Sequence, residues 1–253
     1  MLKQIKDTAK TVEILDVPFF SGSTSEAINL IKKGGLLTAP SGPGLANDLP
    51  SSPEYRRSLV SSDIVLADSG LLCLWTRLFS KKTLRRLSGL EFLREFLRCI
   101  DFLNDSTFWV MPDHVQSQKN CIWLKSEFGI DIGNDLIYVA PKYKSCSLID
   151  DHALLARLDQ LKPRYIFIQI GGGVQERLGI FLKENLTFKS SILCTGAALA
   201  FLSGCQVRIP NWADSIYAGW LFRCFTNPKI FLPRYLKAFR LLFLLFKYEK
   251  KSQ

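Results

Sequence analysis

The sequence predicts an α/β protein, and two observations along the chain support this class. Apolar runs of strand length alternate with stretches that have the 3.6-residue periodicity of amphipathic helices. The runs are continuously apolar, as expected of strands buried on both faces, whereas half-exposed strands alternate apolar with polar residues. Such a pattern favours a Rossmann-like fold, a mostly parallel sheet with helices on both faces. We expect a basic amphipathic helical appendage to follow it at the C-terminus.

The predicted elements follow one another in a regular order. Seven runs predict strands: VEILDVPFF, GGLLTAP, DIVLADS, STFWVMP, DLIYVAP, YIFIQIG and SILCTGA. Four stretches between them predict helices: SEAINLIKKG, GLEFLREFLRCIDFL, QKNCIWLKSEFG and SLIDDHALLARLDQL. A further helix is expected over 175–186. We divide the chain into an α/β domain, residues 1–205, and an appendage, residues 206–253.

The composition excludes several classes of protein. With 47% apolar residues in 253, the chain can bury a real core and is neither disordered nor collagen-like. Its seven cysteines form no CxxC pair and are odd in number, which indicates a reduced, cytoplasmic chain. The only histidines, His114 and His152, are far apart and are expected on the surface, so we expect no metal site.

Neither end of the chain predicts a membrane span. The N-terminal residues lack the apolar region and cleavage site of a secretory signal. The longest uninterrupted apolar run near the C-terminus is LLFLLF, residues 241–246, whereas a bilayer requires about 20 residues.

The positive charge is concentrated in the C-terminal tail. Residues 223–253 hold eight Lys or Arg and one Glu, so most of the net charge of +10 belongs to them. On a helix the two sides of this tail differ. One side gathers the basic residues Arg234, Lys237, Arg240, Lys247 and Lys251, with Leu241 and Leu244 intruding. The other side carries Tyr235, Ala238, Phe239, Leu242 and Phe246. This segregation predicts a helix in the interface of an anionic membrane. The alternative is a helix docked on the core with a solvated basic edge. No motif for binding nucleic acid accompanies the charge, so we expect no such partner.

Ligands of parallel sheets bind beyond the carboxyl ends of the strands, so the residues that end each apolar run are the candidates. The run YIFIQIGGGVQERLG brings three glycines to one such end. It is not a P-loop, because Val174 and Gln175 stand where that motif has Lys and Ser or Thr. It is not a dinucleotide fingerprint either, because Glu176 occupies the third glycine position. We expect a turn whose backbone N–H groups approach an anion at the start of the following helix. An ordinary tight turn with solvated Gln175 and Glu176 is the alternative.

Two other strand ends carry candidate side chains. Asp68 ends the run DIVLAD, where partial burial favours a general base, although Asp is also a common N-cap for a helix such as LLCLWTRLF. In LLTAPSGPGLANDLP, prolines and glycines predict a rigid loop in which Thr38 and Ser41 offer hydroxyls to a phosphate or a sugar. An ordinary connection is the alternative for this loop.

From VEILDVPFF to PRYLKAF, the sequence resembles the WecG/TagA/CpsF family of bacterial glycosyltransferases. The resemblance is carried by Gly196, FLSGCQVRIPNW and AGWLFRCFTNPKIFLPRY, together with LLTAP, LADSG, RRLSGLE and IGGGVQE in the family's order. The chain departs from the family pattern at several positions. Pro40 replaces an Asn, Ser69 a Gly, Glu91 an Asp, and Gly173 and Val174 a Pro-Lys pair. In the tail, Gly219 replaces a Glu, and Ile230 and Pro233 replace arginines.

The resemblance implies an inverting, metal-independent transferase without a cofactor, which moves a sugar, usually an N-acetylhexosamine, from a UDP-sugar to a polyprenyl-diphosphate-linked acceptor. Such an enzyme serves cell-envelope or exopolysaccharide biosynthesis at the cytoplasmic face of the membrane. The site residues that it implies form one set: Asp68 as catalytic base, Thr38 and Ser41 at the sugar, Arg86, Gly171, Gly172, Gln175, Glu176 and Gly196 at the donor, and Arg208, Arg223 and Arg234 in the appendage.

Two rival functions remain at this point. One is a nucleotide-sugar-binding scaffold without turnover. The other is a nicotinamide- or flavin-dependent enzyme, which the missing third glycine disfavours. The sequence leaves the formation of a homo-oligomer open.

Overall fold

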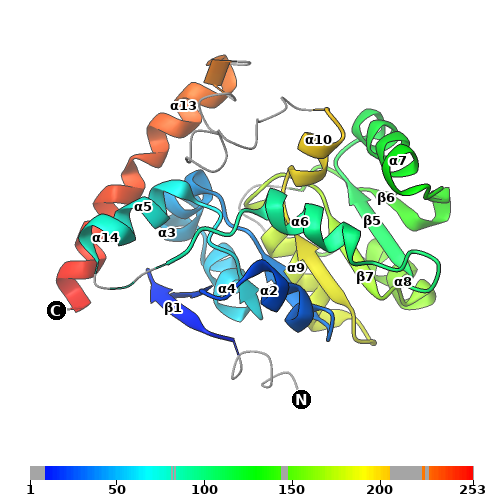
Figure 1. The fold of residues 1–253 in the computed structure, drawn as a ribbon, viewed down its shortest axis with the longest axis horizontal. Coiled ribbons are helices and arrows are strands. Elements are labelled where there is room, and N and C mark those ends of the chain that lie inside the picture. Colours follow the sequence, from blue (N-terminus) through cyan, green and yellow to red (C-terminus); the bar gives the residue numbers. More distant parts are fainter. Residues whose placement is uncertain are drawn as a thin grey trace.

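The computed structural model describes residues 9–80, 82, 84–143, 148–205, 224–225 and 228–252. Its strands form one sheet of eight, in the order β1-β2-β4-β3-β8-β7-β5-β6 (Figure 1). The strands are β1 Thr11–Ile14, β2 Val17–Phe20, β3 Gly35–Thr38, β4 Ile64–Val65, β5 Thr107–Met111, β6 Ile137–Val139, β7 Tyr165–Ile168 and β8 Ser191–Cys194. Among these strands only β1 and β2 pair antiparallel. The predicted fold class, an α/β protein on a mostly parallel sheet, is confirmed.

The run VEILDVPFF is a hairpin, so its prediction as a single strand was wrong. Leu15 and Asp16 have φ angles of 55° and 59° and form a two-residue turn between β1 and β2. Left-handed backbone at both turn positions matches the twist of the paired strands, but it is usually supplied by Gly or Asn. Here Leu15 is buried in the core, and that burial offsets the conformational cost.

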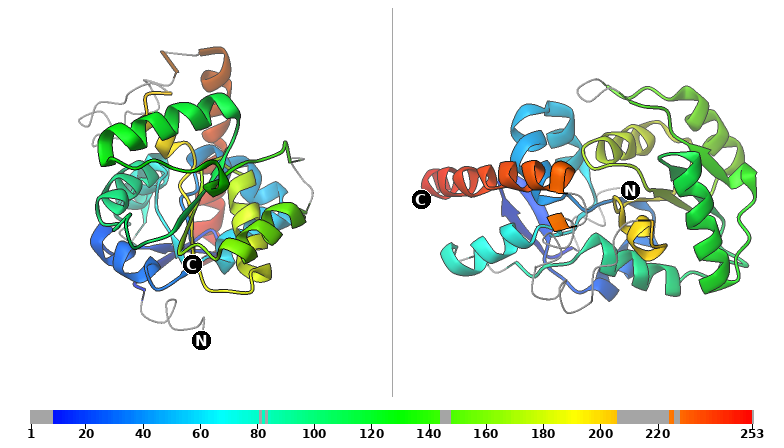
Figure 2. Two further views of the ribbon diagram at one scale, coloured as in Figure 1. Left: turned by 90° about the vertical axis from the view of Figure 1, so that its right-hand side faces the viewer. Right: turned by 90° about the horizontal axis from the view of Figure 1, so that it is seen from above.

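Helices cover both faces of the sheet (Figure 2). On one face, α6 contacts α2 and α10, and α10 contacts α7. On the other face, α9 contacts α4 and shares a hydrophobic cluster with α8. The helices are α2 Thr24–Ile31, α4 Pro53–Ser61, α6 Gly89–Arg98, α7 His114–Phe128, α8 His152–Leu161, α9 Val174–Asn185 and α10 Ala198–Leu202. The expected helices are therefore present, and α9 begins one residue before the predicted 175–186.

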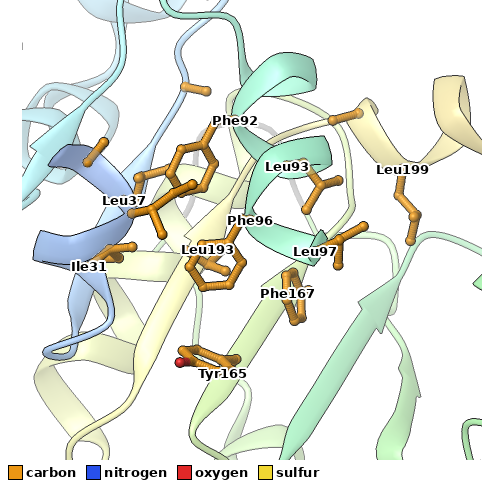
Figure 3. Close-up of a cluster of buried hydrophobic side chains, with 14 of the residues drawn as sticks. Ile31, Leu37, Phe92, Leu93, Phe96, Leu97, Tyr165, Phe167, Leu193 and Leu199 are labelled. Atoms are coloured by element: carbon orange, nitrogen blue, oxygen red, sulfur yellow. The ribbon is translucent and has the colours of Figure 1, made fainter. Parts of the chain in front are cut away.

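A layer of aromatic and aliphatic side chains fastens α6 to the sheet (Figure 3). Phe96 of α6 packs edge-on against Tyr165 and Phe167 of β7, at ring-centroid distances of 5.2 and 6.0 Å. Phe167 stacks on Trp109 of β5 at 4.1 Å. Each such side chain contributes about 2–3 kcal/mol on burial. This packing holds α6 against the middle of the sheet.

The C-terminal segment forms two helices, α13 Pro228–Ala238 and α14 Arg240–Ser252, along one end of the molecule (Figure 1). They contact α5 Gly70–Phe79 and the short turn η1 Gly44–Asp48, which leads into α3 Leu49–Ser51. Leu241 and Leu245 are fully buried there, in one cluster with Leu72 and Trp75. A helical, amphipathic tail is thus confirmed. Leu241, expected to intrude on the basic side, packs into the core, so α14 is docked there as in the alternative stated above.

None of the helices that the structure describes is long and apolar enough to cross a bilayer.

Candidate active site

The sheet has a topological switch point between its neighbouring strands β3 and β8. After β3 the chain continues into η1, α3 and α4, on the face covered by α9. After β8 it continues into α10, on the face covered by α6. Because the two connections leave toward opposite faces, the carboxyl ends of β3 and β8 are the place where this class of fold binds ligands. We use "switch point" for residues 39–41 and 195–196, which follow these strands.

Asp68 follows β4, the strand next to β3, and its carboxylate rests on the start of α6. Its Oδ1 accepts the backbone N–H of Gly89 at 2.9 Å. Nε of Arg86 donates to the backbone carbonyl of the same Asp68 at 3.3 Å. Asp68 and Arg86, predicted separately, therefore lie together.

The interpretation of Asp68 as a helix N-cap is wrong. Ser69 caps α5, since its Oγ accepts the N–H of Leu72 at 3.3 Å. The helix begins at Gly70, so Ser69 occupies the N-cap position. The Asp68 carboxylate instead accepts a hydrogen bond from the first residue of α6.

Gly89 brings the first turn of α6 against the switch point. A Cβ at this position would lie 3.0 Å from Cβ of Ala39 and 3.3 Å from the carbonyl oxygen of Thr195. The backbone of α6 therefore comes close to the ends of both β3 and β8, an approach that no larger residue allows without a shift. Asp68 consequently lies at the switch point.

The loop after β3 lies between Asp68 and the glycine turn 171–173. A Cβ at Gly42 would be 3.1 Å from Oγ of Ser69, and one at Gly172 would be 3.9 Å from Oγ of Ser41. Gly171 is exposed, with nothing within 4 Å of a Cβ placed on it. Ser41 and the bare backbone of Gly171 and Gly172 therefore surround the same space.

Thr38 is fully buried, and its hydroxyl donates to Oγ of Ser62 at 3.1 Å. The structure thus places this hydroxyl in an internal hydrogen bond, one residue before the switch-point loop begins.

Gln175 and Glu176 are buried, with exposed fractions of 1% and 0%, so the alternative of a turn with both side chains solvated is wrong. The N–H of Gly173 donates to Glu176 Oε2 at 2.7 Å, and Nε2 of Gln175 donates to Glu176 Oε1 at 3.1 Å. The N–H of Gly196 donates to Gln175 Oε1 at 2.7 Å. These bonds connect the turn after β7 with the turn after β8.

Burial raises the pKa of Glu176 to about 7. The hydrogen bonds from Gln175 and Gly173 oppose this shift, and the charge of Asp48 adds to it. Asp48 lies close by, because a Cβ on Gly173, whose φ is 87°, would be 2.9 Å from its Oδ2. A neutral-range pKa makes Glu176 sensitive to anything charged that binds nearby.

The predicted arginines of the appendage are not located. Arg208 and Arg223 lie outside the described residues, and Arg234 is in α13 with a side chain that the structure does not describe. His114 and His152 are exposed, as expected. Within the described parts of the chain, no three His, Cys, Asp or Glu side chains gather as a set that would hold a metal ion.

Three residues were not assigned to this site from the sequence: Gly42, Asp48 and Gly89, although Gly89 begins a predicted helix and stands in the stretch RRLSGLE. The stretch SGLE carried a usable signal for Gly89, because Ser followed by Glu three residues later marks a helix start. Indeed Oγ of Ser88 accepts the N–H of Glu91 at 3.0 Å. Asp48 had no such signal, since its proximity to Gly173 depends only on the fold.

Taken together, the switch point gathers a carboxylate, a guanidinium, a hydroxyl and bare backbone amides. Such a set can accept a proton from a substrate hydroxyl and can neutralise an anion that leaves.

Comparison with known proteins gives one family and one curated relative. The family model of the glycosyl transferase WecG/TagA/CpsF family matches residues 12–253. The relative is an N-acetylglucosaminyldiphosphoundecaprenol N-acetyl-beta-D-mannosaminyltransferase of Staphylococcus aureus (strain MRSA252). It is 20% identical over 236 residues, which cover 90% of this chain and 89% of the relative.

Proposed function

This chain belongs to the WecG/TagA/CpsF family of glycosyltransferases, and we propose that it transfers a sugar of the N-acetylhexosamine type from a UDP-sugar to a polyprenyl-diphosphate-linked acceptor. The family and the printed activity of the relative, which names a diphosphoundecaprenol acceptor and an N-acetylmannosaminyl group, support this choice. The reaction proceeds with inversion and without a metal ion, at the cytoplasmic face of the membrane, in cell-envelope or exopolysaccharide biosynthesis.

Asp68 is the base in this proposal. Its carboxylate takes the proton of the acceptor hydroxyl while that oxygen attacks the anomeric carbon of the donor. The bond between the anomeric carbon and the UDP oxygen breaks, and UDP leaves with the electron pair. A single displacement of this kind inverts the configuration. The observation that carries the proposal is the Asp68 carboxylate held on the Gly89 N–H, with Arg86 on the backbone of the same residue.

The departing diphosphate needs its charge neutralised. Arg86 beside Asp68 and the exposed backbone of Gly171 and Gly172, at the start of α9, provide cationic and N–H donors at the switch point. Ser41 between them is suited to a phosphate or sugar oxygen. We also assign Arg208, Arg223 and Arg234 of the appendage to the neutralisation of this diphosphate.

The enzyme acts as a peripheral protein on an anionic membrane surface, through a patch on α5, α13 and α14 that we call the apolar patch. Exposed large side chains make up this patch: Leu78, Phe79, Leu232, Leu236, Phe239, Phe243 and Phe246. Phe79 of α5 and Phe246 of α14 are in contact, with their ring centroids 5.3 Å apart. Exposed cations border the patch: Arg77, Lys237, Arg240 and Lys247. Aromatic side chains flanked by cations favour the headgroup region of anionic bilayers.

The test is a transfer assay with a panel of UDP-sugars and a short-chain polyprenyl-diphosphate sugar, read by mass spectrometry. We expect release of UDP that requires the acceptor, together with a product heavier by one sugar. UDP-sugar binding without transfer to any acceptor would favour the scaffold instead. Binding of nicotinamide or flavin in place of a UDP-sugar would contradict the proposal.

A further inference from the structure

We propose that Gln175 and Glu176 are positioning residues, which form an internal strut that holds the two glycine turns flanking the donor and do not touch the donor themselves. The strut consists of the Gly173 N–H, the side chains of Glu176 and Gln175, and the Gly196 N–H. The inference rests on the proposed function, because that places the donor at these turns.

The first support for the strut is that the polar atoms of both side chains already have hydrogen-bond partners inside the protein. Both carboxylate oxygens of Glu176 accept bonds within the protein, and both ends of the Gln175 amide are engaged, at 3.1 Å and 2.7 Å. Neither side chain is more than 1% exposed. A donor could reach them only by breaking a buried hydrogen bond, which is costly.

The second support is the backbone that the strut joins. Gly173 and Gly196 have φ angles of 87° and 67°, in the left-handed region. Gly173 is the N-cap of α9 and has no side chain with which to cap it, so Glu176 provides the bond from inside the helix. Gly196 stands at the switch point, where its N–H donates to Oε1 of Gln175. The strut therefore fixes the turns that follow two adjacent strands, and the first of these turns carries the amides of Gly171 and Gly172 that are proposed to meet the diphosphate.

A small displacement of such donors is expensive for a transferase. Donors aimed at developing charge act through their fixed geometry, and a shift of about 1 Å can lower the rate about 100-fold. Loss of the strut should therefore weaken the binding of the diphosphate even though the strut does not contact it.

The order of donors and acceptors in the strut allows a reciprocal test. In Glu176→Gln, a new amide N–H group must face either the Gly173 N–H or the Gln175 amide, so one bond is lost. In Gln175→Glu, two carboxylates face each other. In the double variant Gln175→Glu/Glu176→Gln, the new Glu accepts from Gly196 and from the new Gln, whose oxygen accepts from Gly173. All three bonds return with the same charge and nearly the same volume.

The experiment measures UDP affinity by calorimetry for the full chain carrying each change. We expect each single variant to raise the dissociation constant at least tenfold, and the double variant to return within about threefold of the unchanged protein. Glu184→Gln is the matched control. It removes an exposed carboxylate from the same helix, which pairs with Arg57, and it should leave UDP affinity unchanged. A double variant that folds but binds UDP no better than the single variants would overturn the proposal, because a residue that contacts the ligand cannot be exchanged in this way.

Hydrogen–deuterium exchange gives a readout that needs no ligand. Peptides covering 171–177 and 194–198 should exchange faster in both single variants and return to the original rate in the double variant. Unchanged exchange in the single variants would also overturn the strut. If the unchanged protein fails to bind UDP while the exchange pattern appears as expected, the proposed donor is wrong and the strut stands.

Discussion

The carboxylate of Asp68 accepts the backbone N–H of Gly89 at 2.9 Å, across 21 positions of the sequence. This bond joins the end of β4 to the start of α6. A backbone donor of the fold therefore helps to orient the carboxylate. The relationship explains how an acidic residue in the loop after a short strand can serve as a base in a fixed direction.

Replacing Asp68 by Asn should abolish transfer and leave the fold intact. The Asn oxygen still accepts the Gly89 N–H, but an amide cannot take the proton of the acceptor hydroxyl. We expect the turnover number to fall about 1,000-fold, with UDP affinity within a few-fold of the original. Steady-state transfer and calorimetry check this, and normal turnover by the folded variant would refute the assignment of Asp68.

Gly89→Ala and Gly171→Ala form a matched pair. The methyl group at Gly89 meets Cβ of Ala39 and the carbonyl of Thr195, so we expect a loss of about 1–3 kcal/mol in the free energy of unfolding. The methyl group at Gly171 meets nothing, so stability should stay within about 0.5 kcal/mol. Urea denaturation measures both values.

The same pair separates packing from binding. Because Gly171 borders the proposed diphosphate, Gly171→Ala should weaken UDP binding in spite of its unchanged stability. Unchanged UDP affinity in this variant would show that the ligand does not approach the glycine turn.

Glu176 should make the protein less stable as the pH rises toward neutrality. Its pKa is raised from 4.5 to about 7 in the folded protein, so the folded state binds this proton more tightly than the unfolded chain. The stabilising contribution is complete below about pH 4.5 and is lost as the pH rises through 7. Asp48 of η1 and the thiol of Cys194 in β8 also interact electrostatically with this carboxyl group.

Carboxyl groups with a lowered pKa change the stability of the protein with pH in the opposite sense. The effect of Glu176 is therefore isolated by comparing the original protein with a variant that lacks this carboxyl group. The free energy of unfolding of the original protein minus that of Glu176→Gln should decrease between pH 4.5 and 7, by on the order of 2 kcal/mol, and level off above. Urea titrations at several pH values give this curve. A constant difference would contradict the raised pKa.

The ion pair of Lys183 and Asp63 should stabilise the fold without affecting the site. Lys183 Nζ lies 2.6 Å from Asp63 Oδ2, and the Asp63 side chain is 1% exposed. Lys183→Met leaves that carboxylate without its cation, which should cost about 3–5 kcal/mol. Lys183→Met/Asp63→Asn should recover part of the loss. Thermal denaturation tests the order of the three proteins, and equal stability of the two variants would count against the pair.

The apolar patch should govern binding to membranes. Phe239→Ser/Phe243→Ser removes two exposed aromatic side chains and should reduce sedimentation with anionic liposomes severalfold, with little loss of stability. Leu241→Ala is the contrasting variant. It should destabilise the protein by about 2–5 kcal/mol, because Leu241 is fully buried, and leave liposome binding of the folded fraction intact. Equal sedimentation of the double Ser variant and the original protein would rule out this surface.

Local patterns were enough to predict the α/β class, most helices and the strand ends that carry Asp68, Ser41 and the three glycines. Burial on both faces imposes continuous apolar strands, and helices in the same chain show their own period, so both signals are present in short windows. The parallel arrangement then places the carboxyl ends of these strands at one edge. Arg86 ends no strand, and it reaches Asp68 because the loop before α6 passes beside the end of β4.

Other features were decided only by contacts between distant segments. The hairpin turn at Leu15 and Asp16 needs a buried partner for Leu15, and no turn residue announces it. The side of α14 that is buried could not be predicted, because helical periodicity identifies apolar positions but does not say which of them meet α5.

The sequence by itself determined which residues end the strands and what chemistry they offer, since hydrophobic periodicity and residue type are local properties. Only the tertiary structure decided that Gln175 and Glu176 are directed inward to Gly173 and Gly196, and that Gly89 supports Asp68. The physical reason is that a polar side chain takes whichever partner the packed neighbours leave within hydrogen-bonding distance, and those neighbours come from remote parts of the chain.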